Sequence, residues 1–196
     1  MKFLSIIINL AIFISTLMIV VMYFRSDGHW NMERGRKAFR FFTCQSNVLC
    51  GIAAFFMVIA RLTDTLPFAV WLLKYLGTVT VTVTMMTVLL FLGPTMGGYK
   101  ELLAKENLYM HLIGPLLAII SFCFLERGHM SVGMAALGVI PVVCYECLYL
   151  YKVICAPEEK RWRDFYGFNK NGKWQISFAA MAVGTLIICM ILRVLG

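Results

Sequence analysis

A hydroxyl, an imidazole and a carboxylate lie within or beside long apolar segments of this sequence, at Thr43, His111 and Glu146. Such groups can act as a nucleophile, the base that takes its proton and the group that orients the base. In that interpretation Thr43 attacks a carbonyl carbon, His111 accepts the proton, and Glu146 or Asn47 fixes the imidazole. Gln45 or Asn47, with the backbone amides around them, are candidate donors to an oxyanion.

Each of these residues also has a structural interpretation. A threonine near a helix start commonly caps that helix. Gln45, Ser46 and Asn47 could hydrogen-bond across helices, as polar residues in membrane helices often do. His111 could be solvated near a membrane interface, and Glu146 could pair with His111 or with a nearby lysine. The residues alone leave both interpretations open.

Two further sets carry weaker signals. Thr80, Thr84 and Thr87 are spaced to share one face of a helix, but a threonine hydroxyl in a helix commonly bonds a carbonyl of its own helix. Cys144 and Cys147 form a C-x-x-C, which can mark a thiol oxidoreductase. Because this pair lies inside an apolar segment with no second pair at matching depth, helix packing explains it better.

The elements that must position these side chains are membrane helices. The chain is 61% hydrophobic and 14% charged, whereas a soluble domain is roughly a quarter charged and could not bury so much apolar surface at this length. The apolar runs are about 20 residues long and do not alternate, which indicates helices rather than a β-barrel. The sequence predicts an all-α integral membrane protein, a single domain over residues 1–196, with six transmembrane helices at about 4–24, 41–60, 68–93, 109–125, 131–151 and 174–194.

Proline and loop composition add local detail. Gly114-Pro115 and Pro141 predict kinks in the fourth and fifth spans. The segments 29–42 and 160–174 mix aromatic and cationic residues. Each fits either an interfacial amphipathic helix or an aromatic belt with basic anchors.

The cations predict the orientation. Of the 18 Lys and Arg residues, 13 follow spans one, three and five, and five lie on the opposite side. By the positive-inside rule the long loops face the cytoplasm, and both termini lie on the non-cytoplasmic side. This placement and anionic lipids account for the net charge of +8 without nucleic acid as a partner. The compact loops suggest a bacterial inner (cell) membrane.

This topology brings the candidate residues into one leaflet. Spans two and four start, and span five ends, on the same side. Thr43, Asn47, His111 and Glu146 therefore lie within roughly two helical turns of depth of one another. We expect no comparable polar set in the other leaflet.

Three segments resemble a known family. They are FRFFTCQSNVLCGI (39–52), YMHLIGPLLAII (109–120) and VIPVVCYECLYLYKVI (139–154), and they are similar to the androgen-induced-protein family, which includes the androgen-dependent TFPI-regulating protein. The resemblance implies a small protein of about six spans that cleaves fatty acid esters of hydroxy fatty acids. It also implies a threonine nucleophile at Thr43 and a histidine at His111, and it does not supply Glu146.

The preferred function is therefore hydrolysis of a lipid ester within the bilayer, through an acyl-threonine intermediate. The expected partners are a lipid or fatty-acyl ester substrate and membrane lipids, and no metal or organic cofactor is indicated because one membrane histidine without spaced carboxylates does not make a metal site. One alternative is a six-span substrate-capture or transport subunit, which would need a partner for energy coupling. Another is a membrane scaffold without chemistry.

Overall fold

The computed structural model describes residues 1–26, 28–95 and 97–196, and six of its helical segments are long and apolar enough to cross a membrane. The predicted all-α, six-span membrane fold is confirmed, with boundaries within a few residues of those expected. The spans are Lys2–Tyr23, Phe42–Leu62, Phe68–Thr95, Glu106–Leu125, Val132–Cys155 and Trp174–Leu195.

Several spans are built from more than one helical element. The α-helices are α1 (Lys2–Tyr23), α2 (Met32–Ala38), α3 (Phe42–Leu62), α4 (Phe68–Thr87), α5 (Gly93–Thr95), α6 (Glu106–Leu108), α7 (Gly114–Ile120), α8 (Val132–Ala136), α9 (Val139–Leu150) and α10 (Trp174–Leu195). The π-helical segments are η1 (Val88–Leu92), η2 (Tyr109–Ile113), η3 (Ser121–Leu125) and η4 (Tyr151–Cys155), and η5 (Glu158–Lys160) and η6 (Lys170–Gly172) are 3₁₀ turns. The strands β1 (Arg25–Ser26) and β2 (His29–Trp30) form a small antiparallel ribbon.

Prolines explain three of the interruptions, at η1, at η2 and between α8 and α9. Because a proline has no N–H, it cannot bond the carbonyl four residues earlier, and the preceding turn loosens. η1 is followed by Pro94 and η2 by Pro115, and in each case the intervening glycine donates to the carbonyl five residues back. Pro141 lies three residues after Gly138, where the fifth span breaks between α8 and α9. Both predicted kinks are therefore present.

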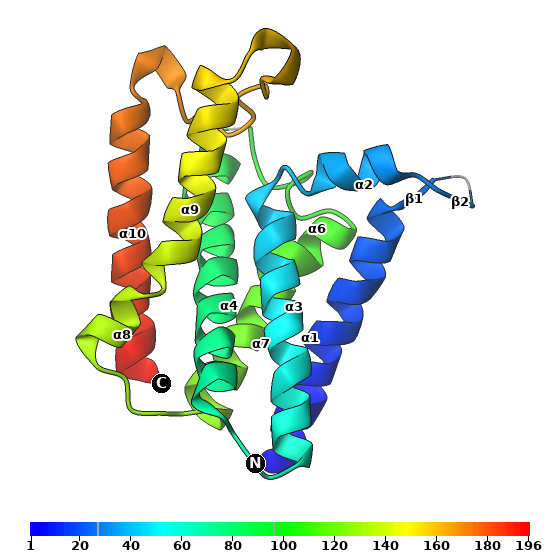
Figure 1. Cartoon of the computed structure of the whole chain (residues 1–196), viewed down its shortest axis with the longest axis vertical. Coiled ribbons are helices and arrows are strands. Elements are labelled where there is room, and N and C mark those ends of the chain that lie inside the picture. Colours follow the sequence, from blue (N-terminus) through cyan, green and yellow to red (C-terminus); the bar gives the residue numbers. More distant parts are fainter. Residues whose placement is uncertain (27, 96) are drawn as a thin grey trace.

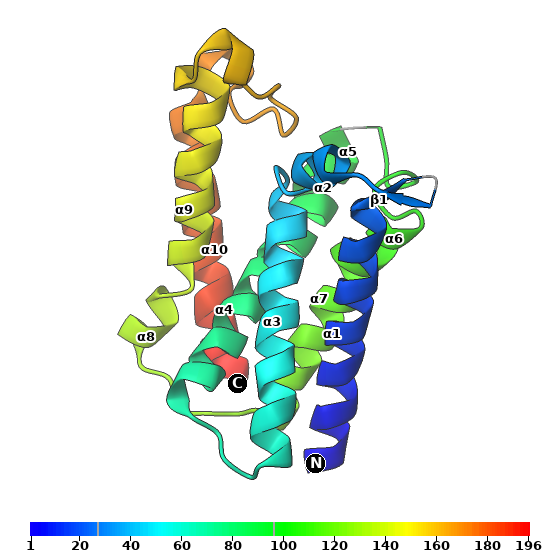
Figure 2. The same cartoon turned by 45° about the vertical axis from the view of Figure 1, so that its right-hand side comes forward.

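α4 lies at the centre of the bundle. It packs against α3 and α7 on one side and against α9 and α10 on the other, while α1 packs on α3 and α7 at the edge (Figure 1). Seen from a second direction, α9 and α10 form a pair that reaches the rest of the bundle through α4 (Figure 2). α4 is the most buried of the six spans and α10 the least, so α10 is the span with the widest lipid-facing surface.

A glycine lets two helices approach closely at this centre. A Cβ atom built on Gly77 of α4 would lie 2.9 Å from the Cα of Cys50 on α3, closer than a side chain tolerates. Apolar residues from α1, α3, α4 and α7 pack around this crossing, among them Ile12, Ala54 and Ala118. α3 is therefore held rigidly, and its first turn carries Thr43.

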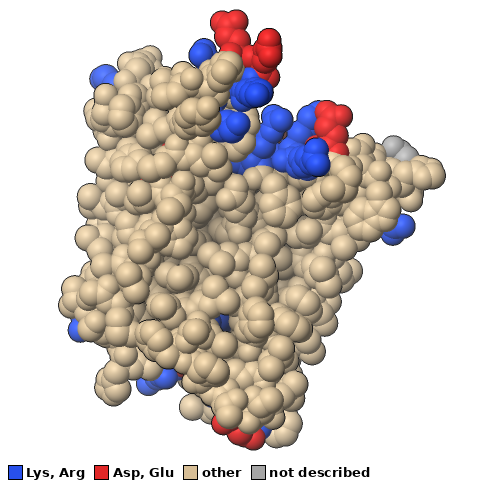
Figure 3. All heavy atoms as spheres, viewed as in Figure 1, with Lys and Arg blue, Asp and Glu red and all other residues tan. Residues whose placement is uncertain are grey.

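The two ends of the bundle differ in charge. We call the end that carries the described loop residues 24–26, 28–41, 97–105 and 156–173 the basic end, and the end where both chain termini lie the terminal end (Figure 1). Lys and Arg side chains gather at the basic end, above a broad band nearly free of charge (Figure 3). Of the two aromatic and basic segments, 29–42 contains the helix α2, whereas 160–174 forms mainly turns around the 3₁₀ segment η6 and packs back on the bundle.

The terminal end contains a cluster of buried polar side chains that the sequence analysis did not predict. Glu126 Oε1 accepts hydrogen bonds from Ser5, Asn9 and Ser121, the Lys74 ammonium donates to Asn9 Oδ1 at 2.6 Å, and it lies 3.8 Å from Glu126 Oε2. All five side chains are buried, and we call them the terminal-end cluster. The expectation of no comparable polar set in this leaflet is wrong, because the bundle turns Lys74, near the start of the third span, and Glu126, directly after the fourth, towards each other in its interior.

Candidate functional site

Thr43 and His111 meet at the basic end of the bundle. The Thr43 hydroxyl lies 3.3 Å from His111 Nε2, although 68 residues separate them in the chain. Thr43 is in the first turn of α3 and His111 in η2. The Thr43 side chain forms no cap on its helix, since the residue before α3 is Phe41 and no side-chain cap is present there.

A backbone carbonyl orients the imidazole. His111 Nδ1 lies 2.6 Å from the carbonyl oxygen of Leu102, which can only accept a hydrogen bond. Nδ1 therefore carries the proton, and in the neutral ring Nε2 is the lone-pair nitrogen facing Thr43. The sequence suggested Glu146 or Asn47 for this orienting role, but the atom bonded to Nδ1 belongs to Leu102.

The local backbone fixes this arrangement. Pro115 cannot donate to the carbonyl of His111, four residues earlier, and η2 is the resulting wide turn. π-turns of this kind are frequent at functional sites. Asn47 ties the two helices together, since its amide nitrogen donates to the Thr43 carbonyl at 2.9 Å and to the Met110 carbonyl at 3.1 Å. Asn47 thus holds the segments that carry the hydroxyl and the imidazole.

Tyr166, from the loop between α9 and α10, completes the surroundings of Thr43. Its hydroxyl accepts the Phe42 amide proton at 3.0 Å and lies within hydrogen-bonding reach of the Thr43 hydroxyl. Burial raises the pKa of the Tyr166 hydroxyl, and the hydrogen bond from the Phe42 amide offsets part of that rise. The phenol therefore keeps its proton at neutral pH and can donate a hydrogen bond beside Thr43.

The loop that carries Tyr166 is itself well anchored. Asp164 accepts the Tyr149 hydroxyl proton and the backbone amides of Phe168 and Asn169. Aromatic rings of the loop, including Phe165, pack on Tyr149. Sequence reasoning missed Tyr166 because its aromatic run was interpreted as a membrane-surface segment, and only the fold brings it to α3.

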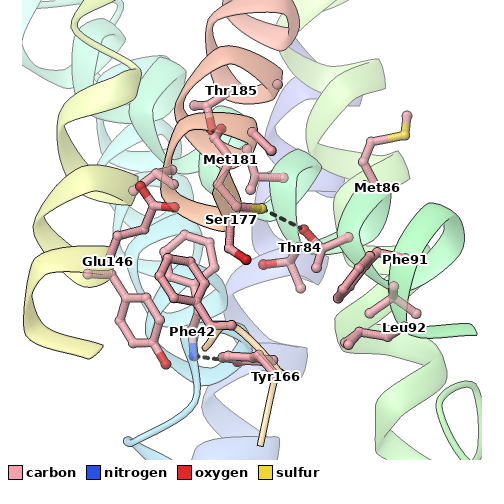
Figure 4. Close-up of a pocket in the computed structure, with 18 of the residues that line it drawn as sticks. Phe42, Thr84, Met86, Phe91, Leu92, Glu146, Tyr166, Ser177, Met181 and Thr185 are labelled. Atoms are coloured by element: carbon pink, nitrogen blue, oxygen red, sulfur yellow. Dashed lines mark hydrogen bonds between the residues drawn. The ribbon is translucent and has the colours of Figure 1, made fainter. Parts of the chain in front are cut away.

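A pocket of about 470 Å³ opens beside Thr43, between α3, α4, α9 and α10 (Figure 4). The volume is within the usual range for small-molecule sites. Its walls are mostly aliphatic and aromatic, and Figure 4 shows Phe42 and Tyr166 at one end and Thr185 at the other. Thr43 lines this pocket while His111 does not, so the hydroxyl lies between its imidazole partner and the cavity.

The pocket also reaches the outer surface of the bundle. Leu90 on η1 and Ile176 on α10 line it, and both are well exposed. In a membrane such apolar surface contacts lipid tails. An acyl chain therefore has a lateral route between η1 and α10 to Thr43.

Glu146 lies in the same pocket but on the opposite wall. Its side chain is 3% exposed and points from α9 into the cavity, towards α10 (Figure 4). Neither carboxylate oxygen has a hydrogen-bond partner among the residues that the structure describes. The two walls meet near Thr43 and Glu146, since the Phe42 and Tyr145 rings pack with centroids 5.0 Å apart.

The remaining candidates have structural partners. Gln45 donates to the Phe39 carbonyl, away from the pocket. The hydroxyls of Thr80 and Thr84 donate to carbonyls of α4 itself, as the structural interpretation expected. The Thr87 hydroxyl points to the sulfur of Met181.

Cys144 and Cys147 are free thiols on the exposed side of α9. Over residues 1–26, 28–95 and 97–196, no group of three or more His, Cys, Asp or Glu side chains could hold a metal ion.

Comparison with known proteins gives no relative: no family model matches the chain, and neither a curated protein nor a solved structure matches it. The site geometry and the sequence resemblance are therefore the grounds for a functional proposal.

Proposed function

We propose that this protein is an intramembrane hydrolase that cleaves lipid esters with Thr43 as nucleophile and His111 as base. The observation that carries the proposal is the 3.3 Å approach of the Thr43 hydroxyl to an imidazole nitrogen whose partner nitrogen is bonded to a backbone carbonyl. Such contacts are often long in unliganded enzymes and tighten with substrate. The adjacent apolar pocket suits an acyl chain.

In the first half-reaction the Thr43 oxygen attacks the ester carbonyl carbon, and His111 Nε2 takes the hydroxyl proton. The tetrahedral intermediate collapses when the bond to the alcohol oxygen breaks. The imidazolium returns its proton to that oxygen, and the alcohol leaves. The acyl group remains bound to Thr43 as an ester.

In the second half-reaction water attacks the acyl-threonine carbonyl. Nε2 of His111 accepts the water proton and returns it to the Thr43 oxygen as the bond to that oxygen breaks. The products are a free fatty acid and the regenerated hydroxyl. The water can arrive from the basic end, where His111 lies close to the loop residue Leu102.

The developing oxyanion needs hydrogen-bond donors. Tyr166 supplies the hydroxyl nearest to Thr43, and the backbone amides at the start of α3 lie beside it. Gln45 and Asn47 are bonded to carbonyls, so Tyr166 takes the role for which those two were candidates.

The resemblance to the androgen-induced-protein family supports the same two residues, and esters of hydroxy fatty acids are the substrate class that it implies. We further propose that the basic end faces the cytoplasm, because 13 of the 18 cations follow spans one, three and five. Both termini then lie on the non-cytoplasmic side, and the membrane is a bacterial inner membrane. The lipid substrate enters from the bilayer between η1 and α10.

A second candidate is a substrate-capture or transport subunit, favoured by one observation. The pocket is large and contains a carboxylate that the described residues leave without a partner, so it can hold a ligand without any chemistry. Such a protein binds lipid saturably and releases it unchanged.

Hydrolysis of a long-chain ester by the purified full-length protein tests the proposal. We expect release of fatty acid by the wild type and by Thr43→Ser, none by Thr43→Ala, and strongly reduced release by His111→Gln. Gln45→Ala is a matched control, since its amide bonds only the Phe39 carbonyl. Equal turnover by Thr43→Ala and the wild type would reject the proposal, and saturable binding without turnover by the wild type would favour the capture subunit.

A further inference from the structure

Glu146 has no role in the chemistry proposed for Thr43 and His111, yet it is the one ionisable side chain of the pocket wall apart from tyrosines among the described residues. It belongs to a face of α9 with Val142 and Tyr149, which also line the cavity. The residue is almost completely buried and faces the cavity (Figure 4), so bulk water does not solvate it.

The neighbouring hydroxyl groups do not serve as partners for this carboxyl group. Thr185, on the facing wall of α10, donates to the Met181 carbonyl at 2.7 Å. The Tyr145 hydroxyl donates to the Arg40 carbonyl at 2.7 Å. No Lys, Arg or His side chain is part of the lining as far as the structure describes it. The described residues therefore enclose the Glu146 carboxyl group without offering it a hydrogen-bond partner.

Such an arrangement is unfavourable unless something else occupies the pocket. Buried polar groups are nearly always hydrogen-bonded, and an ionisable group inside a membrane protein marks a functional site by default. Glu126 shows what a structural carboxylate in this same protein receives: three hydrogen bonds to Oε1 and a lysine 3.8 Å from Oε2. Glu146 receives neither.

We propose that Glu146 recognises a hydrogen-bond donor, a hydroxyl or an amine, on the lipid that fills the pocket. A carboxylate accepts hydrogen bonds on both oxygens, so a ligand hydroxyl or ammonium group satisfies it, whereas a plain acyl chain does not. The apolar walls select the rest of the ligand. The chemical class is thus a long-chain lipid that carries a donor group on an otherwise apolar body.

The position of Glu146 relative to Thr43 indicates where on the ligand the hydrogen-bond donor lies. Thr43 and Glu146 line the same cavity, and Phe42 and Tyr145, their neighbours in sequence, pack with ring centroids 5.0 Å apart. A ligand whose carbonyl carbon lies at Thr43 therefore brings atoms a few bonds away to Glu146. A donor near the ester fits this geometry, and a donor far along the chain does not. This placement rests on the proposed function, since it takes Thr43 as the site of the ester.

The test measures binding to the Thr43→Ala protein, so that no turnover is needed. Displacement of a fluorescent fatty acid is measured with methyl hexadecanoate, its 3-hydroxy and 3-amino derivatives and its 12-hydroxy isomer. We expect the 3-hydroxy or the 3-amino ester to bind at least about tenfold more tightly than the plain ester, as a hydrogen bond to an otherwise unsatisfied buried group provides. The 12-hydroxy isomer controls for polarity alone and gains no such advantage.

Variants of Glu146 then assign the preference to this side chain. Glu146→Leu is expected to abolish the preference for the 3-substituted ester while binding the plain ester at least as tightly as the parent. Glu146→Gln is expected to retain part of that preference. Tight binding of the plain ester by Glu146→Leu also shows that the variant is folded.

An absent preference in the parent, an equal preference for the 12-hydroxy isomer, or an unchanged preference in Glu146→Leu each overturns the proposal. Because binding is measured in a protein without the nucleophile, a failure of ester hydrolysis in the wild type is a separate result.

Discussion

Two groups of buried polar side chains lie at opposite ends of this bundle, and they differ in how completely their members satisfy one another. In the terminal-end cluster, Lys74 and Glu126 form an ion pair, and Asn9 donates a hydrogen bond to Glu126 and accepts one from Lys74. Beside the pocket, Glu146 has no hydrogen-bond partner in the described chain, and the hydrogen bond between Thr43 and His111 is long, at 3.3 Å.

This difference indicates that Glu126 has a structural role and Glu146 a functional one. A carboxylate that accepts three hydrogen bonds and has a lysine 3.8 Å away ties together α1, α4 and the end of the fourth span, because moving any of them would strand a charge in a low dielectric. A carboxylate without partners fixes nothing by itself and destabilises the empty state. Glu126 and Glu146 are both almost completely buried, so the presence or absence of partners distinguishes them.

The largest expected effect is on turnover at the pocket. His111→Gln should reduce kcat for a long-chain ester by about 10²–10⁴-fold, the usual contribution of a general base, and Thr43→Ala should abolish acyl transfer. Thr43→Ala should change thermal stability little, because the Thr43–His111 bond is long. His111→Gln also loses the hydrogen bond to the Leu102 carbonyl and should lower the free energy of unfolding by about 1 kcal/mol. Steady-state kinetics and a melting curve on the same preparations measure both quantities. Loss of folding in parallel with loss of activity would make the site structural, like the terminal-end cluster.

Breaking the terminal-end cluster should lower stability instead. Lys74→Met leaves Glu126 buried without its cation, and removing one partner of a buried pair costs about 3–5 kcal/mol. The double variant Lys74→Met/Glu126→Gln should recover most of this loss, because the neutral amide oxygen that it introduces still accepts from Ser5 and Ser121. Denaturant unfolding in detergent measures the free energies. A loss of less than about 1 kcal/mol in the single variant would contradict the structural role.

A smaller effect of opposite sign is expected at Glu146. Glu146→Leu should raise the free energy of unfolding of the unliganded protein by about 1–3 kcal/mol, since it removes an unsatisfied buried group. Glu126→Leu provides the matched comparison and should destabilise, because it removes the acceptor of three hydrogen bonds. If both substitutions destabilise to the same extent, Glu146 has a structural partner after all.

The smallest effect is expected on the threonines of α4. The Thr80 hydroxyl donates to the Gly77 carbonyl of its own helix. That carbonyl can still accept a backbone amide proton of the helix when the hydroxyl is removed. Thr80→Val should therefore change stability by less than about 1 kcal/mol and leave turnover unaltered. Melting temperature and kcat are the two readouts. A large loss of turnover would place this face of α4 in the chemistry.

Much of the fold follows from the sequence, because each apolar run must close its own backbone hydrogen bonds in lipid, which dictates helices of a set length. The pairing of Thr43 with His111 also follows, since topology alone brings both to one leaflet. Pro115 and Pro141 mark the interruptions because a missing N–H acts locally. These features are set by residues close in sequence or by the membrane, so they can be predicted without a structure.

The remaining features depend on which helix faces which. Lys74 lies in the third span and Glu126 directly follows the fourth, and no periodicity in the sequence shows that these two side chains turn inwards together. The orienting partner of His111 is the Leu102 carbonyl, and a backbone atom has no signature in the sequence. Tyr166 lies far along the chain from Thr43, in a loop whose composition suggested a membrane surface. Long-range packing, which composition does not encode, decides all three.

The most direct test of the account is covalent labelling of the native protein with a long-chain fluorophosphonate, followed by mapping of the adduct by mass spectrometry. A hydroxyl activated by the imidazole should take the label on Thr43, and His111→Gln should remove that adduct while the protein stays folded. Labelling that is absent from Thr43, or that persists unchanged without the imidazole, would contradict the claim that these two side chains form a nucleophile and its base.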